Sequence, residues 1–289
     1  MATLIARLPT TPGSIRDHAL RGLDRLPAPS PVVGRLLSRL AFKNVEMKEL
    51  KGLIEKDVLL CGHVLRTVNS AAFARSSTIT SLQQAMSLLG LGRLRRIAVG
   101  FAVGNLFPRV ETPPSWSKQR FILHSGATAL LTEAIVDSAR LNNQDGAFVG
   151  GMLHDLGKLL IAVTLPQDYE TIALRVQVNE QRAFECERET LGFDHAELSA
   201  IALLKWGLPE PVCQAVYYHH DPQSASAPKL AMVIARADCF VNHLGITVLP
   251  PSAHDSEPPS LEIQGCEFDT LAVLQRFERE WLELAKFFE

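Results

Sequence analysis

Apolar residues recur at spacings of three and four along most of this chain, and this period constrains the fold more than any other feature. Val33, Leu36 and Leu40 form one such stripe, and Leu274 and Phe277 belong to another near the end of the sequence. The spacing places the apolar side chains on one face of an α-helix. No segment alternates apolar and polar residues for long enough to indicate a half-buried strand. The sequence therefore predicts an all-α fold.

Prolines and glycines divide the predicted helices and indicate where the chain separates into lobes. Because proline cannot continue a helix, Pro108, Pro113 and Pro114 mark the preferred boundary. We expect two helical lobes, residues 1–110 and residues 111–248, followed at 249–289 by a Pro/Ser-rich loop and an amphipathic helix. The predicted helices cover residues 30–42, 47–57, 57–73, 81–107, 115–140, 147–164, 167–182, 195–206, 210–220, 228–244 and 268–288.

Charge is distributed unevenly between the two predicted lobes. Residues 1–100 contain 15 Lys and Arg against 6 Asp and Glu, a net charge of +9. Residues 101–289 contain 14 against 25, a net charge of −11. Either the two parts attract each other, or the first part binds an acidic partner.

The composition narrows the class of protein. Apolar residues make up 47 % of the chain, enough for a sizeable core, and no unbroken apolar stretch approaches the roughly 18 residues that a membrane span needs. The first residues lack a signal-type apolar segment, so we expect a cytoplasmic protein without a membrane partner. The five cysteines are widely spaced and form no CxxC motif, which argues against a disulfide or cysteine–zinc framework.

The segment LLGLGRLRRI carries the most basic part of the first lobe. Arg93, Arg95 and Arg96 could neutralise the phosphates of a nucleic acid. Aromatic stacking groups are absent nearby, which weakens a single-strand interpretation. The alternative is that Arg95 and Arg96 form a solvated face or pair with the acidic second lobe.

A set of histidines and aspartates is placed in or at the ends of apolar helical segments such as FILHSGATALL and GGMLHDLGKLLI. Helices of one lobe can direct such side chains toward a shared interior point. Mixed imidazole and carboxylate ligands suit iron, manganese, zinc or nickel better than magnesium or calcium. The candidate metal ligands are His124, His154, Asp155, His195, His219, His220 and Asp238.

Local sequence also suggests how two of these positions are prepared. Asp194 and Glu197 have capping-box spacing, which starts a helix at His195. The positive end of the helix dipole should disfavour a protonated His195, and a metal requires a neutral nitrogen. Lys158 follows His154 by four residues on the same helical face, where it could meet a phosphate oxygen or a carboxylate.

The ordered set of these residues resembles the HD superfamily of metal-dependent phosphohydrolases. The chain as a whole resembles the HDOD domain, the HD-related output domain of bacterial signalling proteins. The resemblance runs from LPAPSPVVGRLL to AVYYHHDP and includes LIEKDVLLCGHVLRTVNSAAF, FVGGMLHDLGKLLI and LGFDHAELSAIALLKWGLPEPV. It implies two helical lobes, of which the second is a helical bundle like an HD domain.

The resemblance also assigns roles to individual residues. His124, His154, Asp155 and Asp238 stand where the superfamily holds its first metal, and Asp155 would bridge two metals if two bind. His195, His219 and His220 stand where the related HD-GYP phosphodiesterases hold further ligands. Lys158 matches the lysine of their HDxGK segment, which contacts phosphate or activated water. In an enzyme, Lys158 and Asp155 would be the catalytic residues.

Two departures from HD-GYP enzymes argue against hydrolysis of a cyclic dinucleotide. DPQSASAPKL follows the paired histidines where those enzymes carry GYP, and Arg120 occupies the position of an additional carboxylate ligand. HDOD proteins are mostly regarded as regulatory modules without established activity. The resemblance therefore implies an output module that acts on other signalling proteins and has a metal-competent pocket. The alternative is an active metal-dependent phosphohydrolase or phosphodiesterase that uses a metal-activated water.

Overall fold

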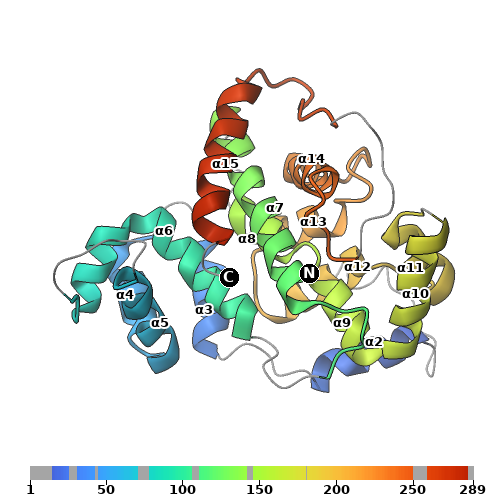
Figure 1. The fold of residues 1–289 in the computed structure, drawn as a ribbon, viewed down its shortest axis with the longest axis horizontal. Helices are drawn as coiled ribbons and strands as arrows, with labels where there is room; N and C mark the ends of the chain where they lie inside the picture. Colours follow the sequence, from blue (N-terminus) through green and yellow to red (C-terminus); the bar gives the residue numbers. More distant parts are fainter. Residues whose placement is uncertain are drawn as a thin grey trace.

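The chain folds into packed helices (Figure 1). The computed structural model describes residues 15–25, 31–42, 45–70, 78–105, 111–141, 146–179, 181–249 and 259–285. Within these ranges every regular element is a helix and no strand occurs. The predicted all-α fold is therefore confirmed, whereas Pro108 and most of the predicted Pro/Ser-rich loop lie outside the described residues.

The first lobe is a small group of amphipathic helices around an apolar core. Asp57 starts α5 because its carboxylate accepts hydrogen bonds from the backbone N–H groups of Leu59 and Leu60. Gly90 has a φ of 69° and kinks α6 in the middle. The apolar faces bury residues such as Leu36 and Leu37. The helices are α3 (Pro31–Leu40), α4 (Met47–Ile54), α5 (Val58–Val68) and α6 (Leu82–Asn105).

The second lobe is arranged around α7, which is buried on most sides because α8, α14 and α15 pack against it (Figure 1). Its remaining helices cover the other faces of α8 and α9. The bounds are α7 (Lys118–Ser138), α8 (Ala147–Leu153), α9 (Leu156–Thr164), α10 (Pro166–Asn179), α11 (Ala183–Leu191), α12 (His195–Lys205), α13 (Glu210–Tyr217), α14 (Lys229–His243) and α15 (Thr270–Ala285).

The predicted helix over residues 147–164 is broken in the structure. α8 ends at Leu153, and α9 begins at Leu156 after Asp155 adopts a φ of −95° and a ψ of 7°. Apolar periodicity could not reveal this break, because both helices are buried on all sides. The break matters because it occurs at the predicted ligands His154 and Asp155.

Among the described residues, this segment is also the one that is both long and apolar. By length and composition alone, Ala147–Thr164 would be sufficient to cross a membrane. In the fold, 83 % of this segment is buried inside the protein, as expected of a core helix.

Two glycines allow the helices of the second lobe to approach closely. A Cβ atom at Gly157 would lie 2.0 Å from the backbone oxygen of His195, and one at Gly151 would lie 2.7 Å from the Cα of Ala129. The Gly157 N–H also donates a hydrogen bond to the buried Ser199 hydroxyl. Gly157 therefore lets α9 and the start of α12 meet beside the predicted metal ligands.

Ion pairs join the first lobe to the second. Arg95 and Arg96 on α6 lie 3.4 and 3.3 Å from the carboxylate of Glu133 on α7. Both arginine side chains are largely buried, so the interpretation of LLGLGRLRRI as a nucleic-acid site loses two of its three cations. The structure shows the alternative that the sequence also allowed, in which Arg95 and Arg96 pair with the acidic second lobe.

The N-terminal helix α2 (Ile15–Arg25), which the sequence did not predict, packs on α9. Gly22 contacts Thr164, and Arg16 forms an ion pair with Glu197 in the first turn of α12. Although it precedes the first lobe in sequence, α2 thus lies against the second.

Candidate metal centre

The seven predicted ligands come from five places in the second lobe and gather in its interior. His124 lies on α7, His154 and Asp155 at the break between α8 and α9, and His195 is the first residue of α12. His219 and His220 follow α13, and Asp238 lies on α14. All are buried except His220 and Asp238, which are half-buried. The contacts described below show that the fold brings all seven together.

The first group of donors, from His124, His154, Asp155 and Asp238, has the spacing of ligands around one ion. His124 Nε2 lies 3.2 Å from Asp155 Oδ2 and 3.1 Å from Asp238 Oδ1. His154 Nε2 lies 3.4 Å from Asp155 Oδ1 and 3.5 Å from Asp238 Oδ1. Ligands bonded at about 2.0–2.2 Å to one ion are separated by about 3.0–3.5 Å in octahedral or tetrahedral geometry.

Several of these atoms are buried without a hydrogen-bond partner among the described residues. They are the Nε2 atoms of His124, His154 and His219 and the Oδ1 atom of Asp155. Buried polar atoms are nearly always satisfied, so such a group of exceptions in one place requires an explanation. Bound cations would satisfy such atoms.

Backbone carbonyls fix the rings of these three histidines. Nδ1 of His124 lies 2.7 Å from the carbonyl oxygen of Ile246, and Nδ1 of His154 lies 2.7 Å from that of Gly151. His219 has the same kind of bond to Val216, at 2.6 Å. A carbonyl can only accept, so each Nδ1 carries a hydrogen and each Nε2 is the nitrogen that faces inward. This is how proteins orient histidine ligands toward metals.

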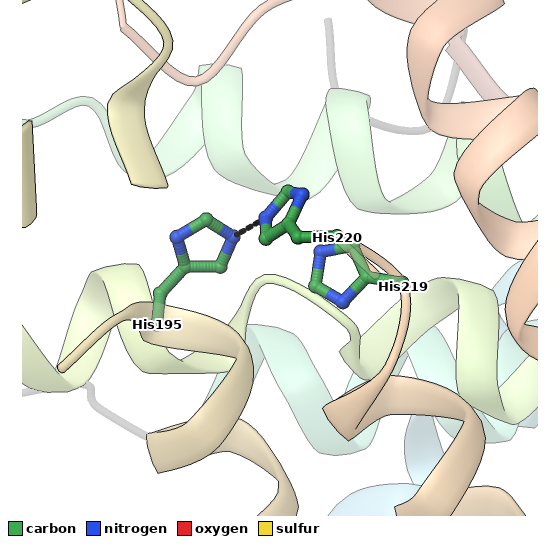
Figure 2. Close-up of side chains that lie close together, drawn as sticks. All are labelled: His195, His219 and His220. Carbon is green, nitrogen blue, oxygen red and sulfur yellow. Dashed lines mark hydrogen bonds between the residues drawn. The ribbon is translucent and has the colours of Figure 1, made fainter. Parts of the chain in front are cut away.

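The second group of donors consists of His195, His219 and His220, whose rings lie close together (Figure 2). One nitrogen from each histidine can be chosen so that all three lie within 4.8 Å of one another. His195 Nε2 lies 3.0 Å from Asp155 Oδ1 and 2.8 Å from His220 Nε2. Within this group, two histidines therefore contact each other directly through their Nε2 atoms.

Asp155 lies between the two groups. Its Oδ1 atom faces His154 and His195, and its Oδ2 atom faces His124. Lys158 donates a hydrogen bond of 2.6 Å to Oδ2. Of the two partners considered for Lys158, a carboxylate or a phosphate, the structure shows the carboxylate.

Mutual electrostatics keeps the carboxylates ionised despite their burial. Burial alone would raise the pKa of Asp155, but His154 and Lys158 hold it well below its usual range. Burial would also raise the pKa of Asp238, which His124 and His154 lower instead. The carboxylates in turn raise the pKa of Lys158 against the effect of burial. Both aspartates are thus in the form that binds a cation.

The histidines divide into two kinds. Burial would lower the pKa of His124, but contacts with Asp155 and Asp238 raise it to about 9. Burial and the neighbouring His154 and His195 lower the pKa of His219 to about 3. His219 is consequently neutral and ready to bind a metal, whereas His124 must release a proton first.

The expectation of a neutral His195 is wrong for the metal-free fold. Asp194 does start α12, by accepting a hydrogen bond from the Glu197 N–H at 3.0 Å. However, Glu187 lies 2.6 Å from His195 Nδ1. Burial would lower the pKa of His195, but Glu187 and Asp155 raise it to about 9. These full charges outweigh the partial charge of the helix end.

The buried charges of the centre balance if a divalent ion is present. Three carboxylates, on Asp155, Glu187 and Asp238, are accompanied by one ammonium group, on Lys158. A divalent ion would neutralise the remaining two negative charges. Without an ion, protonation of His124 and His195 supplies the same two positive charges. The residues present therefore fit a divalent cation in number, spacing and charge.

Sequence reasoning missed the residues that support the ligands. Asn242 donates a hydrogen bond of 2.8 Å to Asp238 Oδ1, and its position four residues later on α14 was a usable signal. Glu187 gave no comparable signal, because FECERETL reads as an ordinary charged helix. The carbonyl of Ile246 belongs to a loop, and a sequence carries no information about its direction.

These features define the class of protein: an all-helical protein whose second lobe encloses a histidine–aspartate centre of HD type. The HDOD domain family matches residues 26–222, more than half of the chain, and the protein belongs to that family. An uncharacterised protein of Treponema pallidum (strain Nichols) is 26 % identical over 184 residues. That match covers 62 % of this chain and 34 % of the relative, so this chain spans about a third of the relative's length.

Two solved structures share the fold. An HDOD domain protein of unknown function from Geobacter sulfurreducens has a TM-score of 0.76 at 21 % identity, over 94 % of this chain and 96 % of that one. A proposed phosphohydrolase from Shewanella amazonensis SB2B has a TM-score of 0.68 at 22 % identity, over 94 % of this chain and 98 % of that one. At these identities the likeness establishes the fold alone.

Proposed function

We propose that this protein is a signal-transduction output module that holds a divalent metal ion in its second lobe and acts through contacts with other signalling proteins. The observation that carries the proposal is the enclosure of the donor set. His124, His154, Asp155 and His195 have no exposed surface, and His219 is 2 % exposed. An ion held by buried donors stabilises the lobe but offers little room for a phosphoester.

A first ion would be held by His124, His154, Asp155 and Asp238, of which the first three have a buried donor atom without a hydrogen-bond partner. A second ion would be held by His195, His219 and His220. When bound, a divalent ion supplies Lewis-acid chemistry toward a phosphoryl oxygen. Lys158 holds Asp155 in position through its hydrogen bond, and Asn242 does the same for Asp238.

A second candidate is phosphoester hydrolysis, and the position of Lys158 favours it. Lys158 is 8 % exposed, and its ammonium group lies beside the carboxylate that faces both donor groups. A cation there would attract the phosphate of a substrate that reached the centre. One relative of this fold is named as a proposed phosphohydrolase. Cyclic dinucleotides remain poor candidates, because DPQSASAPKL replaces the GYP segment.

Elemental analysis of freshly purified protein, followed by a screen of phosphoester substrates, separates these functions. The proposed function predicts about one or two equivalents of iron, manganese, zinc or nickel, without turnover of any phosphoester. Hydrolysis that disappears in a folded His154→Ala variant would establish the enzyme instead. A protein that contains no metal and binds none on addition would overturn the metal centre itself.

A further inference from the structure

Helix α11 contacts the second donor group from outside and contributes no predicted ligand. Cys186 and Leu191 are buried and anchor the helix in the core. α11 ends at Gly192, whose φ of 80° turns the chain sharply toward α12. Glu187 and Phe184 on this helix both reach the histidines of the centre.

Glu187 holds His195 at two points. Its Oε2 atom accepts a hydrogen bond of 2.7 Å from the backbone N–H of His195 and one of 2.6 Å from Nδ1. The carboxylate is 2 % exposed, so water does not compete for these bonds. Because Nδ1 donates to Glu187, Nε2 is left to face Asp155 and His220.

The next residue along α11 reinforces this arrangement. Arg188 donates hydrogen bonds of 2.7 and 2.6 Å to Oδ2 of Asp194, the residue that caps α12. Consecutive residues of α11 thus hold consecutive residues at the start of α12. The backbone of His195 and its ring are both fixed relative to α11.

Phe184 holds His220, the half-buried histidine of the group. Its ring stacks on His220 with centroids 4.2 Å apart and an angle of 18° between the planes. The stacked His220 then directs Nε2 toward His195 (Figure 2). A stacked aromatic neighbour restricts the ring rotation that a half-buried histidine would otherwise have.

We propose that α11 is the positioning element of the second donor group, with Glu187 orienting His195 and Phe184 orienting His220. This inference rests on the proposed metal centre. Neither residue is among the predicted ligands, and each acts through a histidine of the second donor group. His195 and His220 differ in this from His124, His154 and His219, which backbone carbonyls orient.

The test measures binding of Co²⁺ to the metal-free full-length protein by calorimetry and by visible absorption. Loss of a group that orients a metal-binding histidine typically weakens binding about 10–100-fold. We expect this loss for Glu187→Ala, together with a shift of the Co²⁺ absorption bands. Glu187→Gln keeps a hydrogen-bond acceptor, so it should retain the band positions and most of the affinity.

A second pair of variants tests Phe184 in the same way. Phe184→Ala should weaken Co²⁺ binding and change the spectrum, and Phe184→Tyr, which preserves the stacked ring, should restore both. Glu189→Gln is the matched control, because Glu189 lies on the exposed side of α11 and pairs with Arg175. Its Co²⁺ affinity and spectrum should equal those of the unmodified protein.

The outcomes distinguish this inference from the proposed function. If the unmodified protein binds no Co²⁺, the metal centre is wrong and the role of α11 falls with it. If it binds Co²⁺ and folded Glu187→Ala binds with the same affinity and spectrum, only the role of α11 is overturned. If Glu187→Ala does not fold, Glu187→Gln and the two Phe184 variants still test the proposal. An unchanged Co²⁺ spectrum of Phe184→Ala would then reject it.

Discussion

The two lobes are built from the same kind of helix, but their cores differ in chemistry. Among the described residues before position 111, Thr67 is the only buried polar side chain. The second lobe buries a whole set of polar and charged groups. They are His124, Ser125, Thr128, Thr132, His154, Asp155, Lys158, Glu187, Asp194, His195, Ser199 and His219.

The difference shows how a core can reveal a function. Burying a charged group is costly unless a partner compensates it. The first lobe avoids this cost, as a lobe with only a structural role would. The second lobe buries charged groups at the candidate metal centre, where the charges balance if a divalent ion is included. The contrast predicts that the lobes respond differently to matched changes.

The largest difference should appear between two glycine substitutions. Gly157→Ala places a Cβ atom 2.0 Å from the backbone oxygen of His195, so α9 and α12 must separate. Overpacking against a backbone should lower the free energy of unfolding by about 3 kcal/mol or more. Gly92→Ala on α6 meets no atom within 4 Å and should raise it by about 0.5–1 kcal/mol.

Urea unfolding of both variants measures this difference. Gly157→Ala should also lose Co²⁺ affinity, because it displaces His195 from Asp155. Equal stability of the two variants would mean that α9 and α12 are not in close contact.

A second pair of variants should separate ion binding from stability. Asp155→Asn removes the charge shared by both donor groups and should weaken Co²⁺ binding by at least about 100-fold, since a ligand matters more than its supporting partners. Leu37→Ala leaves a cavity in the first lobe and should cost about 2–5 kcal/mol of stability without changing Co²⁺ affinity. Calorimetry of both proteins checks this, and a Leu37→Ala protein with weakened Co²⁺ binding would contradict the independence of the lobes.

The metal-free protein should lose stability as the pH rises. The pKa values of His124 and His195 are raised to about 9 in the fold, above the ordinary 6.5. Their contribution is therefore fully present below pH 6.5 and is lost as the pH rises through about 9. The loss should be on the order of 2 kcal/mol, and bound metal should abolish it because the ion replaces the protons.

A histidine of the first lobe provides a control, because its pKa is shifted in the opposite direction. Burial and the neighbouring Arg66 lower the pKa of His63, so its contribution is lost as the pH falls below 6.5. His63→Gln should leave the loss at high pH intact. Thermal unfolding between about pH 5 and 9, with and without a chelator, measures both effects. Stability of the metal-free protein that stays constant up to pH 9 would contradict protonation of the centre.

The sequence predicted the helical fold because each helix requires an apolar stripe, and such a stripe is visible in the sequence. It also indicated the donor set, because histidine and aspartate are conspicuous in apolar segments such as GGMLHDLGKLLI. It did not reveal the break at His154 and Asp155. Apolar periodicity reports which face is buried, and it carries no information where every face is buried.

The supporting groups were hidden for different reasons. Glu187 is a charged residue in a charged helix, and only the turn at Gly192 brings it to His195. The protonation of His195 was mispredicted for the same reason, since the helix end was visible in the sequence and the carboxylate was not. Long-range partners depend on tertiary packing, which a local pattern does not contain.

The smallest effect should come from the contact between the lobes. Glu133 lies 3.4, 3.3 and 3.8 Å from Arg95, Arg96 and Arg276, and its side chain is largely buried. Glu133→Gln removes the negative charge that these three guanidinium groups share. We therefore expect the free energy of unfolding to fall by about 1 kcal/mol. The centre itself is untouched, and Co²⁺ affinity should remain the same.

Salt and a surface pair sharpen this last prediction. The difference between Glu133→Gln and the unmodified protein should shrink little in 1 M salt, because a buried network is screened less than an exposed pair. Glu55→Gln removes an exposed pair with Lys51 on α4 and should change stability by less than about 0.5 kcal/mol. If Glu133→Gln altered Co²⁺ binding as much as stability, the ion centre would extend into the contact between the lobes. The apolar first core and the charged second core would then not belong to two independent units.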